Sequence, residues 1–393
     1  MNKAGSLLGG TLLVAGTSIG GGVLALPVLT SLGGFVPSIT LYLICWAFMA
    51  CTGLLYLEVT HWMEGEPNII SMAEKTLGSA GKLAAWVIYL FFFYSLTVAY
   101  VVGCGNLITE VLPIPEWAGS LVFVALFAPF VFGGAKIVGK LNVILMIGLG
   151  VSYCGFVFVG YPFVNTALLA RSDWPLSIIA LPVIFAAFGY QGIIPTLSTY
   201  MHRDMLKTRK AILLGSFIPL ISYVIWQWLI LGIVPTYGAG GLFEALQNGQ
   251  NAVQPLKNFT NNPNVYLLGQ FFAFFALTTS FFGVTLGLKD FLADGLRVKK
   301  DTRGKLLLLM IVFLPPLAIA IVNPHVFLKA LDLAGGFGSA LLLGLLPILM
   351  VWSGRYRLKL ASHIAIAGGR PLLLLLTAFV LFELCFELKH IFF

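Results

Sequence analysis

Long apolar stretches constrain this chain more than any other feature of its sequence. The first, LLGGTLLVAGTSIGGGVLALPVL, contains no charged residue, and runs of similar length recur along the chain. About 20 apolar residues in a helix cross the ~30 Å hydrocarbon core of a bilayer. Only 10% of the residues are charged, whereas soluble domains carry roughly 25%. The sequence therefore predicts an all-α polytopic membrane protein and argues against a β-barrel of short alternating strands.

Eleven membrane-spanning helices are expected from these runs. They fall near residues 5–29, 35–61, 81–111, 118–134, 140–161, 176–200, 211–233, 265–289, 305–323, 327–351 and 371–390. The basic residues then indicate the orientation. With the N-terminus inside, 19 of the 23 Lys and Arg residues face the cytoplasm, and Arg171, Lys257, Lys329 and Lys389 face outward. This bias predicts a cytoplasmic N-terminus and an outward C-terminus. It also explains the net charge of +8 through contact with anionic lipid, without nucleic acid.

Two of the predicted spans carry interruptions at mid-length. The first contains TSIGGG, residues 17–22, and the sixth contains FAAFGYQGIIP, residues 185–195. A glycine in a helix interior costs up to ~1 kcal/mol relative to alanine. Interrupted spans at matching positions of two halves are typical of transporters built from inverted repeats. We therefore expect a first five-helix repeat over residues 1–161, an inverted second repeat over 176–351, and an additional helix over 371–393.

A broken span offers main-chain groups to a ligand. A new helix start presents N–H groups, which attract a carboxylate, and a helix end presents C=O groups, which attract an ammonium group or a small cation. Such groups are costly against lipid, so they must line a cavity. The alternative interpretation is that Gly20, Gly21 and Gly22 only let helices approach closely. The second interruption favours a binding site, and aromatic rings beside it suit a flat substrate.

Other classes of function find little support in the residues. No metal-ligand spacing and no set of catalytic side chains within the spans indicates an enzyme, and no cofactor or metal cluster is expected apart from a coupling ion. A channel would need several polar pore-lining spans. A membrane sensor that binds the same ligand without transport would share the whole site, so that alternative stays open.

Several stretches resemble the hydroxy and aromatic amino acid permease family of bacteria, especially its tyrosine-specific members. They include VAGTSIGGGVLALP, LLYLEV, AFGYQGIIPTLSTYM, TTSFFGVTLGLKDFLAD, FLPPLA and GGRP. This family belongs with the amino acid–polyamine–cation transporters. The resemblance implies the five-plus-five inverted repeat of the leucine-transporter type, with helices one and six broken. It also implies ion-driven uptake of tyrosine, tryptophan or phenylalanine across the inner membrane of a bacterium, with no obligate protein partner.

The resemblance also implies which residues bind the substrate. The carboxylate is expected at the backbone of Gly20, Gly21 and Gly22, and Thr17, Ser18 and Ile19 form the other edge of the break. The ammonium group is expected at carbonyls around Ala15 and Phe185. The gate and ring pocket are expected from Phe188, Gly189, Tyr190 and Gln191, with Tyr100 on span three.

Two departures from the family pattern concern the coupling ion. Gln191 stands where relatives commonly have a histidine, and the span-five position that often holds a lysine lies near Leu149. Thr279 and Ser280, with carbonyls of Gly16 and Ile19, resemble the sodium site of the wider fold, and oxygen ligands suit a hard cation. Glu58 is a candidate proton carrier, because a carboxylate within a span is often functional, although it could also reach water at the inner interface. H⁺ and Na⁺ therefore both remain candidates, with H⁺ slightly favoured.

Overall fold

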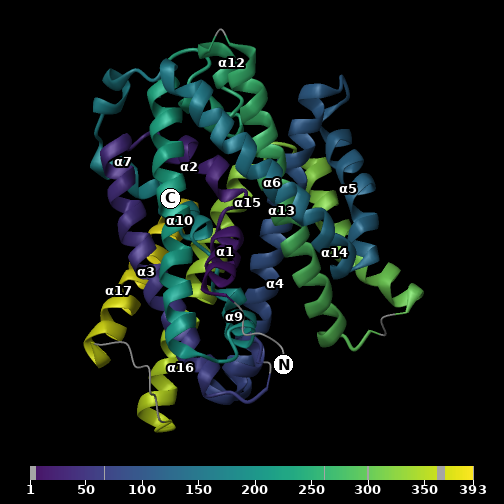
Figure 1. Ribbon diagram of the computed structural model, residues 1–393, viewed down its shortest axis with the longest axis vertical. Coiled ribbons are helices and arrows are strands. Elements are labelled where there is room, and N and C mark those ends of the chain that lie inside the picture. Colours follow the sequence, from purple (N-terminus) through teal and green to yellow (C-terminus); the bar gives the residue numbers. More distant parts are fainter. Residues whose placement is uncertain (1–5, 66, 261, 299–300, 361–367, 393) are drawn as a thin grey trace.

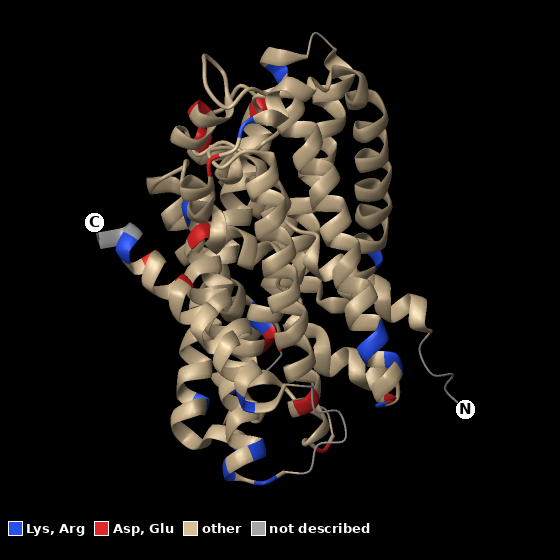
Figure 2. Cartoon of the chain, turned by 90° about the vertical axis from the view of Figure 1, so that its left-hand side faces the viewer, with Lys and Arg blue, Asp and Glu red and all other residues tan. Residues whose placement is uncertain are grey.

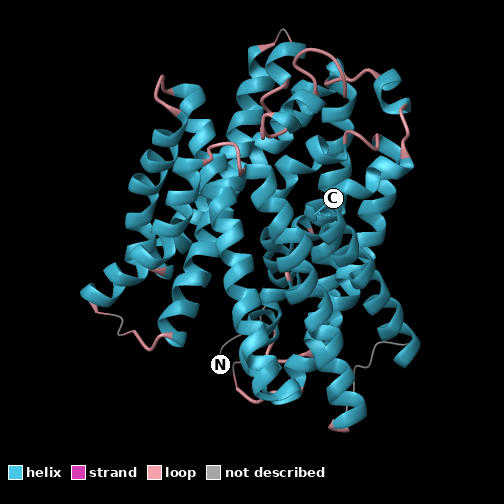
Figure 3. Cartoon of the chain, turned by 180° about the vertical axis from the view of Figure 1, so that it is seen from behind, coloured by secondary structure: helices cyan, strands magenta, loops and turns pink. Residues whose placement is uncertain are grey.

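The computed structural model describes residues 6–65, 67–260, 262–298, 301–360 and 368–392. Gly5 at the start of the first predicted span, and Lys3, Lys299 and Lys300 of the inward-facing charges, lie outside these residues. Within the described residues the chain is helical throughout, apart from turns, loops and one isolated bridge between Gly34 and Ser172 (Figure 3).

Ten helices are long and apolar enough to cross a membrane, and the bent pair at the N-terminus makes an eleventh candidate span. The prediction of an all-helical membrane protein with eleven spans is therefore confirmed. The single-helix spans are α3 (Phe35–His61), α4 (Ile69–Val111), α5 (Glu116–Gly133), α6 (Ala135–Gly160), α10 (Met205–Ile233), α13 (Pro263–Gly295), α14 (Thr302–Val322) and α17 (Gly369–Phe392).

The remaining three spans are each divided into shorter segments. The first consists of α1 (Leu7–Ser18) and α2 (Gly22–Thr30). The sixth contains α7 (Trp174–Ser177), α8 (Leu181–Ala187) and α9 (Ile194–Tyr200). The tenth contains α15 (Phe327–Leu333), the π-helical η5 (Ala334–Leu345), α16 (Leu346–Trp352) and η6 (Ser353–Arg357).

Local sequence explains several helix boundaries. Asp204 accepts a hydrogen bond from the Lys207 N–H at 3.0 Å, and this N-cap starts α10. Asn68 caps α4 in the same way, about twelve residues before the predicted start of span three. Gly78, with φ of +77°, turns the chain within α4, so the membrane-spanning part begins close to the predicted residue 81.

The broken spans lie inside the bundle. In Figure 1, α1 and α2 follow one another near its centre; α1 packs chiefly against α10, and α2 packs against α8 and α10. The segments α9 and α16 lie toward the lower end, and α12 (Leu256–Phe259) lies at the upper end (Figure 1). Figure 2 shows charged residues at both ends of the molecule and a further group at mid-height, on the helix that ends at the C-terminus and beside it, while most of the bundle between the ends is uncharged.

Candidate functional site

The first interruption separates two helices that bend by 54° at residues 19–21. Ile19 N–H still donates to the Ala15 carbonyl at 3.0 Å, and Val23 N–H donates to the Gly20 carbonyl at 3.2 Å. The amides of Gly20, Gly21 and Gly22 therefore lie between the last hydrogen bond of α1 and the first one of α2. They stand at the start of α2, where the helix dipole favours a negative group.

The second interruption lies between α8 and α9. Phe188 N–H and Gly189 N–H close the end of α8 by donating to Ile184 and Ala186 carbonyls, both at 3.2 Å. The chain then leaves the helical conformation at Tyr190, passes through the short 3₁₀ turn η4 (Gln191–Ile193), and resumes as α9. Both segments that were predicted to be broken are thus broken in the structure.

The two interruptions touch each other. A Cβ atom on Gly22 would lie 3.0 Å from both the Cα and the Cβ of Ala187. The Tyr223 hydroxyl on α10 lies 2.7 Å from the Ser18 carbonyl and 2.8 Å from the Ala187 carbonyl. One hydroxyl hydrogen is therefore shared between the carbonyls that end α1 and α8. This places two negative helix ends and one positive helix start within a single small region.

Aromatic side chains surround this region. The Tyr100 ring lies against Gly21, where a Cβ atom would be 2.6 Å from the ring. Phe188 meets the rings of Tyr223 at 5.1 Å and Tyr42 at 6.3 Å, both edge to face. These contacts are the ordinary geometry of aromatic pairs. The side chains named here are all buried, so aromatic rings enclose the meeting point of the two breaks.

Some predicted site residues point elsewhere. The Phe185 ring packs against Phe48 and Phe379, and its carbonyl accepts from Ser339 Oγ at 3.3 Å. Tyr190 and Gln191 face α3. Gln191 Nε2 donates to Thr52 Oγ1 at 3.0 Å and to the Met49 carbonyl at 3.3 Å, and its Oε1 accepts from Tyr190 N–H at 2.8 Å.

Thr17, unlike its neighbours, is exposed, and its hydroxyl donates to the Leu13 carbonyl within α1. Ser18 is buried and its hydroxyl lies 3.4 Å from the Val14 carbonyl. Both hydroxyl groups therefore bond carbonyls within α1, and only the main-chain groups of Thr17 and Ser18 face the break. Ala15 is also buried, and its carbonyl already accepts from Ile19.

Only some of the residues expected at an ion site come together. Ser280 Oγ would be 2.5 Å from a Cβ atom on Gly20, so Ser280 lies at the first break. The Thr279 hydroxyl donates within its own helix, to carbonyls of Phe275 and Ala276. Gly16 faces Met146 of α6, and Leu149 is buried on that helix.

Glu58 lies apart from the breaks, in a buried ion pair. Its carboxylate is 1% exposed and accepts two hydrogen bonds from Arg355, at 2.7 Å from Nε and 2.5 Å from the second guanidinium nitrogen. This two-point pair joins α3 to the end of span ten. Both carboxylate oxygens of Glu58 are therefore engaged by the guanidinium group of Arg355 in this structure.

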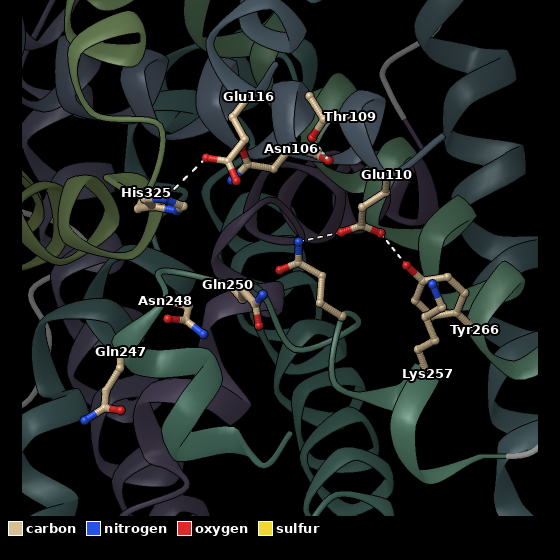
Figure 4. Close-up of a pocket in the computed structure, with 11 residues that line it drawn as sticks. Asn106, Thr109, Glu110, Glu116, Gln247, Asn248, Gln250, Lys257, Tyr266 and His325 are labelled. Carbon is tan, nitrogen blue, oxygen red and sulfur yellow. Dashed lines mark hydrogen bonds and ion pairs between the residues drawn. The ribbon is translucent and has the colours of Figure 1, made fainter. Parts of the chain in front are cut away.

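A polar cavity of about 480 Å³ lies toward the C-terminal end of α4. The connection over residues 235–264 supplies one wall, while α4, α13 and the turn at His325 supply others. Glu110 accepts hydrogen bonds from Gln254 and Tyr266, and Glu116 pairs with His325 at 3.3 Å (Figure 4). Asn106 also lines this cavity, six residues beyond Tyr100, or ~9 Å along the helix at 1.5 Å per residue.

Side chains fill the space between this cavity and the breaks. A Cβ atom on Gly103 would lie 2.9 Å from the Phe327 ring and 3.1 Å from Leu277. On the same side, Ala252 N–H donates to the Leu24 carbonyl at 3.0 Å, which ties the connection over residues 235–264 to α2. The breaks are therefore covered on the side of the polar cavity in this structure.

Sequence reasoning missed three residues of this region: Tyr42, Tyr223 and Gln227. The Tyr42 hydroxyl donates to Gln227 at 2.7 Å, and Gln227 donates to Thr30 at 2.6 Å. The signal available in the sequence was Gln227, a polar residue on the otherwise apolar span seven. Trp226, the neighbour of Gln227 on α10, packs against Phe156 and Phe272.

Comparison with known proteins identifies relatives along almost the whole chain. The model of the tryptophan/tyrosine permease family matches residues 3–386. A tyrosine-specific transport system of Haemophilus influenzae is 33% identical over 361 residues, covering 90% of this chain and 89% of the relative. A tryptophan-specific transport protein of the same organism is 30% identical, covering 93% of this chain and 92% of the relative.

A solved structure shares the fold. The crystal structure of a manganese transporter from Eremococcus coleocola superimposes with a TM-score of 0.64 at 14% sequence identity, covering 97% of this chain and 86% of that one. At this identity the likeness concerns the arrangement of helices and not the ligand.

Proposed function

This chain belongs to the tryptophan/tyrosine permease family, and from that premise we propose that it imports aromatic amino acids, with tyrosine as the preferred substrate. The observation that carries the proposal is the meeting of two broken spans at Gly22 and Ala187. The relatives at 33% and 30% identity are named for tyrosine and tryptophan transport, and they supply the substrate class.

In this proposal the first break binds the carboxylate of the amino acid. The amides of Gly20, Gly21 and Gly22 precede the first hydrogen bond of α2, and the helix dipole adds to their attraction. The ammonium group is bound by carbonyls at the ends of α1 and α8. Those of Ser18 and Ala187 lie within hydrogen-bond distance of one atom, the Tyr223 hydroxyl oxygen, so one ammonium group in its place would meet both. The carbonyls expected at Ala15 and Phe185 accept instead from two separate donors, Ile19 N–H and Ser339 Oγ.

The aromatic side chain of the substrate then lies among Tyr100, Phe188 and Tyr42. Rings stack or meet edge to face at 4.5–7 Å, and each such pair adds about 0.5–1.5 kcal/mol. Tyr190 and Gln191 act indirectly in this scheme, because their hydrogen bonds to α3 fix the course of the second break.

Transport follows from alternating access to this site. We propose that spans 1, 2, 6 and 7 rock as a bundle against the rest, as in other transporters built from inverted repeats. On the outer side the route would run through the cavity beside Glu110, once Leu277 and Phe327 separate. The protein would lie in the inner membrane of a bacterium, with its N-terminus in the cytoplasm and its C-terminus outside.

We further propose that H⁺ drives uptake. A charge moving through ~100 mV yields about 2.3 kcal/mol, enough to hold roughly a 50-fold gradient of substrate. Na⁺ is the second candidate, because Ser280 lies at Gly20 in the first break. Thr279, whose hydroxyl is bonded within its own helix, gives that alternative less support.

Counterflow in proteoliposomes tests the proposed function. Vesicles loaded with unlabelled tyrosine should accumulate external labelled tyrosine without any ion gradient, and excess tryptophan or phenylalanine should compete. A sensor of the same fold would bind tyrosine, as measured by scintillation proximity with detergent-solubilised protein, yet would give no exchange. Binding of tyrosine without counterflow would therefore show that the protein is a sensor and not a transporter.

A further inference from the structure

Two glutamates of the last helix lie buried without hydrogen-bond partners. Glu383 and Glu387 are each 0% exposed, and among the described residues none of their four carboxyl oxygens has a partner. They share one face of α17 with Leu373, Leu376 and Val380, all buried, as the i, i+3, i+7 spacing requires. Figure 2 shows acidic residues on the helix that ends at the C-terminus, well away from the charged lower end of the molecule.

The surroundings of this pair are apolar or acidic, with one lysine at the edge of the cluster. Asp332 of α15 lies within electrostatic range of both glutamates, and Lys329 of the same helix acts on Asp332. The Cys45 thiol of α3 faces Glu383. The other segments packed against α17, namely η5, α16 and α8, contain no titratable residue. On α17 itself, Lys389 follows the pair and is exposed.

A buried carboxylate with no partner is strongly disfavoured in its charged form. Several carboxyl groups so close together raise the cost further, because like charges cannot all ionise at short range. Such a cluster needs bound protons or a bound cation. The described residues contain no group of His, Cys, Asp or Glu with the geometry of a metal site, so the proton is the ligand that fits.

Packing contacts connect the carboxyl cluster of Glu383, Glu387 and Asp332 to the second break. The carboxyl group of Glu387 lies against Gly336, where a Cβ atom would be 2.7 Å from Cδ. The adjacent Gly335 packs on the Pro182 carbonyl of α8. One helical turn before Glu383, the Phe379 ring lies 5.7 Å from that of Phe185, near the end of α8. The cluster thus contacts α8, the helix that ends at the second break, in two ways: through the glycines of η5 and through the Phe379 ring.

We propose that Glu383 and Glu387, together with Asp332, form the binding site of the coupling proton, and this inference rests on the proposed transport function. Taking up a proton neutralises one carboxyl group and lets α17 seat closely against η5 and α8. Losing it leaves a charge that disfavours this packing. The glycines of η5 and the Phe379–Phe185 contact then transmit the difference to the break, where the substrate binds.

The test compares exchange with gradient-driven accumulation in the same proteoliposomes. An inward proton gradient of one pH unit supports about tenfold accumulation at one proton per tyrosine. In the wild type we expect both this tenfold accumulation of tyrosine and counterflow. In Glu383→Gln/Glu387→Gln, counterflow should stay within about twofold of wild type, while the accumulation ratio should fall from about ten to about one. Cys385→Ser, an exposed change on the same helix, should behave as wild type in both assays.

The outcomes separate the two proposals. No counterflow by the wild type would reject the proposed transport function. Counterflow by the wild type, with about tenfold proton-driven accumulation by the double glutamine variant, would reject the proton site alone. Accumulation by the wild type that follows only an imposed Na⁺ gradient would likewise reject the proton site.

A measurement on the wild type keeps the inference testable if the double variant does not fold. Dicyclohexylcarbodiimide reacts with protonated carboxyl groups in apolar surroundings, so peptide mass spectrometry should find adducts on Glu383 or Glu387. The extent of labelling should fall as the pH is raised from 6 to 9. Addition of tyrosine should change the rate of labelling. Unmodified peptides at both glutamates throughout this range would overturn the proposal.

Discussion

The break between α1 and α2 is shaped by glycines, whereas the break between α8 and α9 is held by side chains. Tyr100, Ser280 and Ala187 approach the main chain of Gly20–Gly22 so closely that a Cβ atom at these glycines would lie only 2.5 to 3.0 Å from them. At the second break, Gln191 binds both Tyr190 N–H and α3. The first break therefore depends on the absence of side chains and the second on hydrogen bonds. Substitutions should damage them in different ways.

The strongest test of this difference is Gly22→Leu. Its side chain would enter the main chain of α8 at Ala187, and overpacking of this kind costs up to ~3 kcal/mol, or about 100-fold in binding. We expect tyrosine counterflow to fall to background while the protein remains monodisperse in detergent. Gly192→Ala is the matched control, because a Cβ atom there meets nothing within 4 Å. Normal counterflow by Gly22→Leu would show that the first break does not form the site.

Gln191→Ala should have the next largest effect. It removes hydrogen bonds to Thr52 and Met49 and leaves buried groups unsatisfied, at ~1–3 kcal/mol each. We expect a lower midpoint of thermal unfolding and a loss of about tenfold in transport. Thr196→Ala changes an exposed residue of the neighbouring α9 and should alter neither. If unfolding temperature and transport both stay at wild-type values, the second break is not held by this side chain.

How far the sequence predicted these features depends on whether each feature is local. Both breaks were located to within a few residues, because Gly and Pro act on the chain where they stand. The span count followed from length and apolar composition. The bond from Tyr223 to Ser18 and Ala187, and the pair between Glu58 and Arg355, join residues far apart in the chain. Such partners are set by tertiary packing, and no spacing in one sequence reveals them.

Tyr223→Phe tests whether the two breaks act as one site. It keeps the ring beside Phe188 but removes the hydroxyl that joins the ends of α1 and α8. One hydrogen bond contributes about 0.5–1.5 kcal/mol, so we expect a change of up to about tenfold in the KM for tyrosine with little change in expression. Tyr153→Phe loses a hydroxyl that donates from α6 to the Ser222 carbonyl of α10 and should leave KM unaltered. Equal KM values for both variants and wild type would separate the two breaks functionally.

The smallest expected effect concerns the ion. If the first break binds only the substrate carboxylate, Ser280→Ala and Thr279→Val should change uptake by less than about threefold, because the Thr279 hydroxyl is bonded within its own helix. Uptake should also be equal in Na⁺ and choline buffers. Thr285→Val, which removes a similar buried bond to Phe281, serves as the control. A Na⁺-dependent uptake that both variants abolish and the control keeps would place a cation at the first break. The first break would then bind its ligands through side-chain oxygens as well as main-chain groups. The two breaks would differ less in how they depend on side chains than the glycines alone suggest.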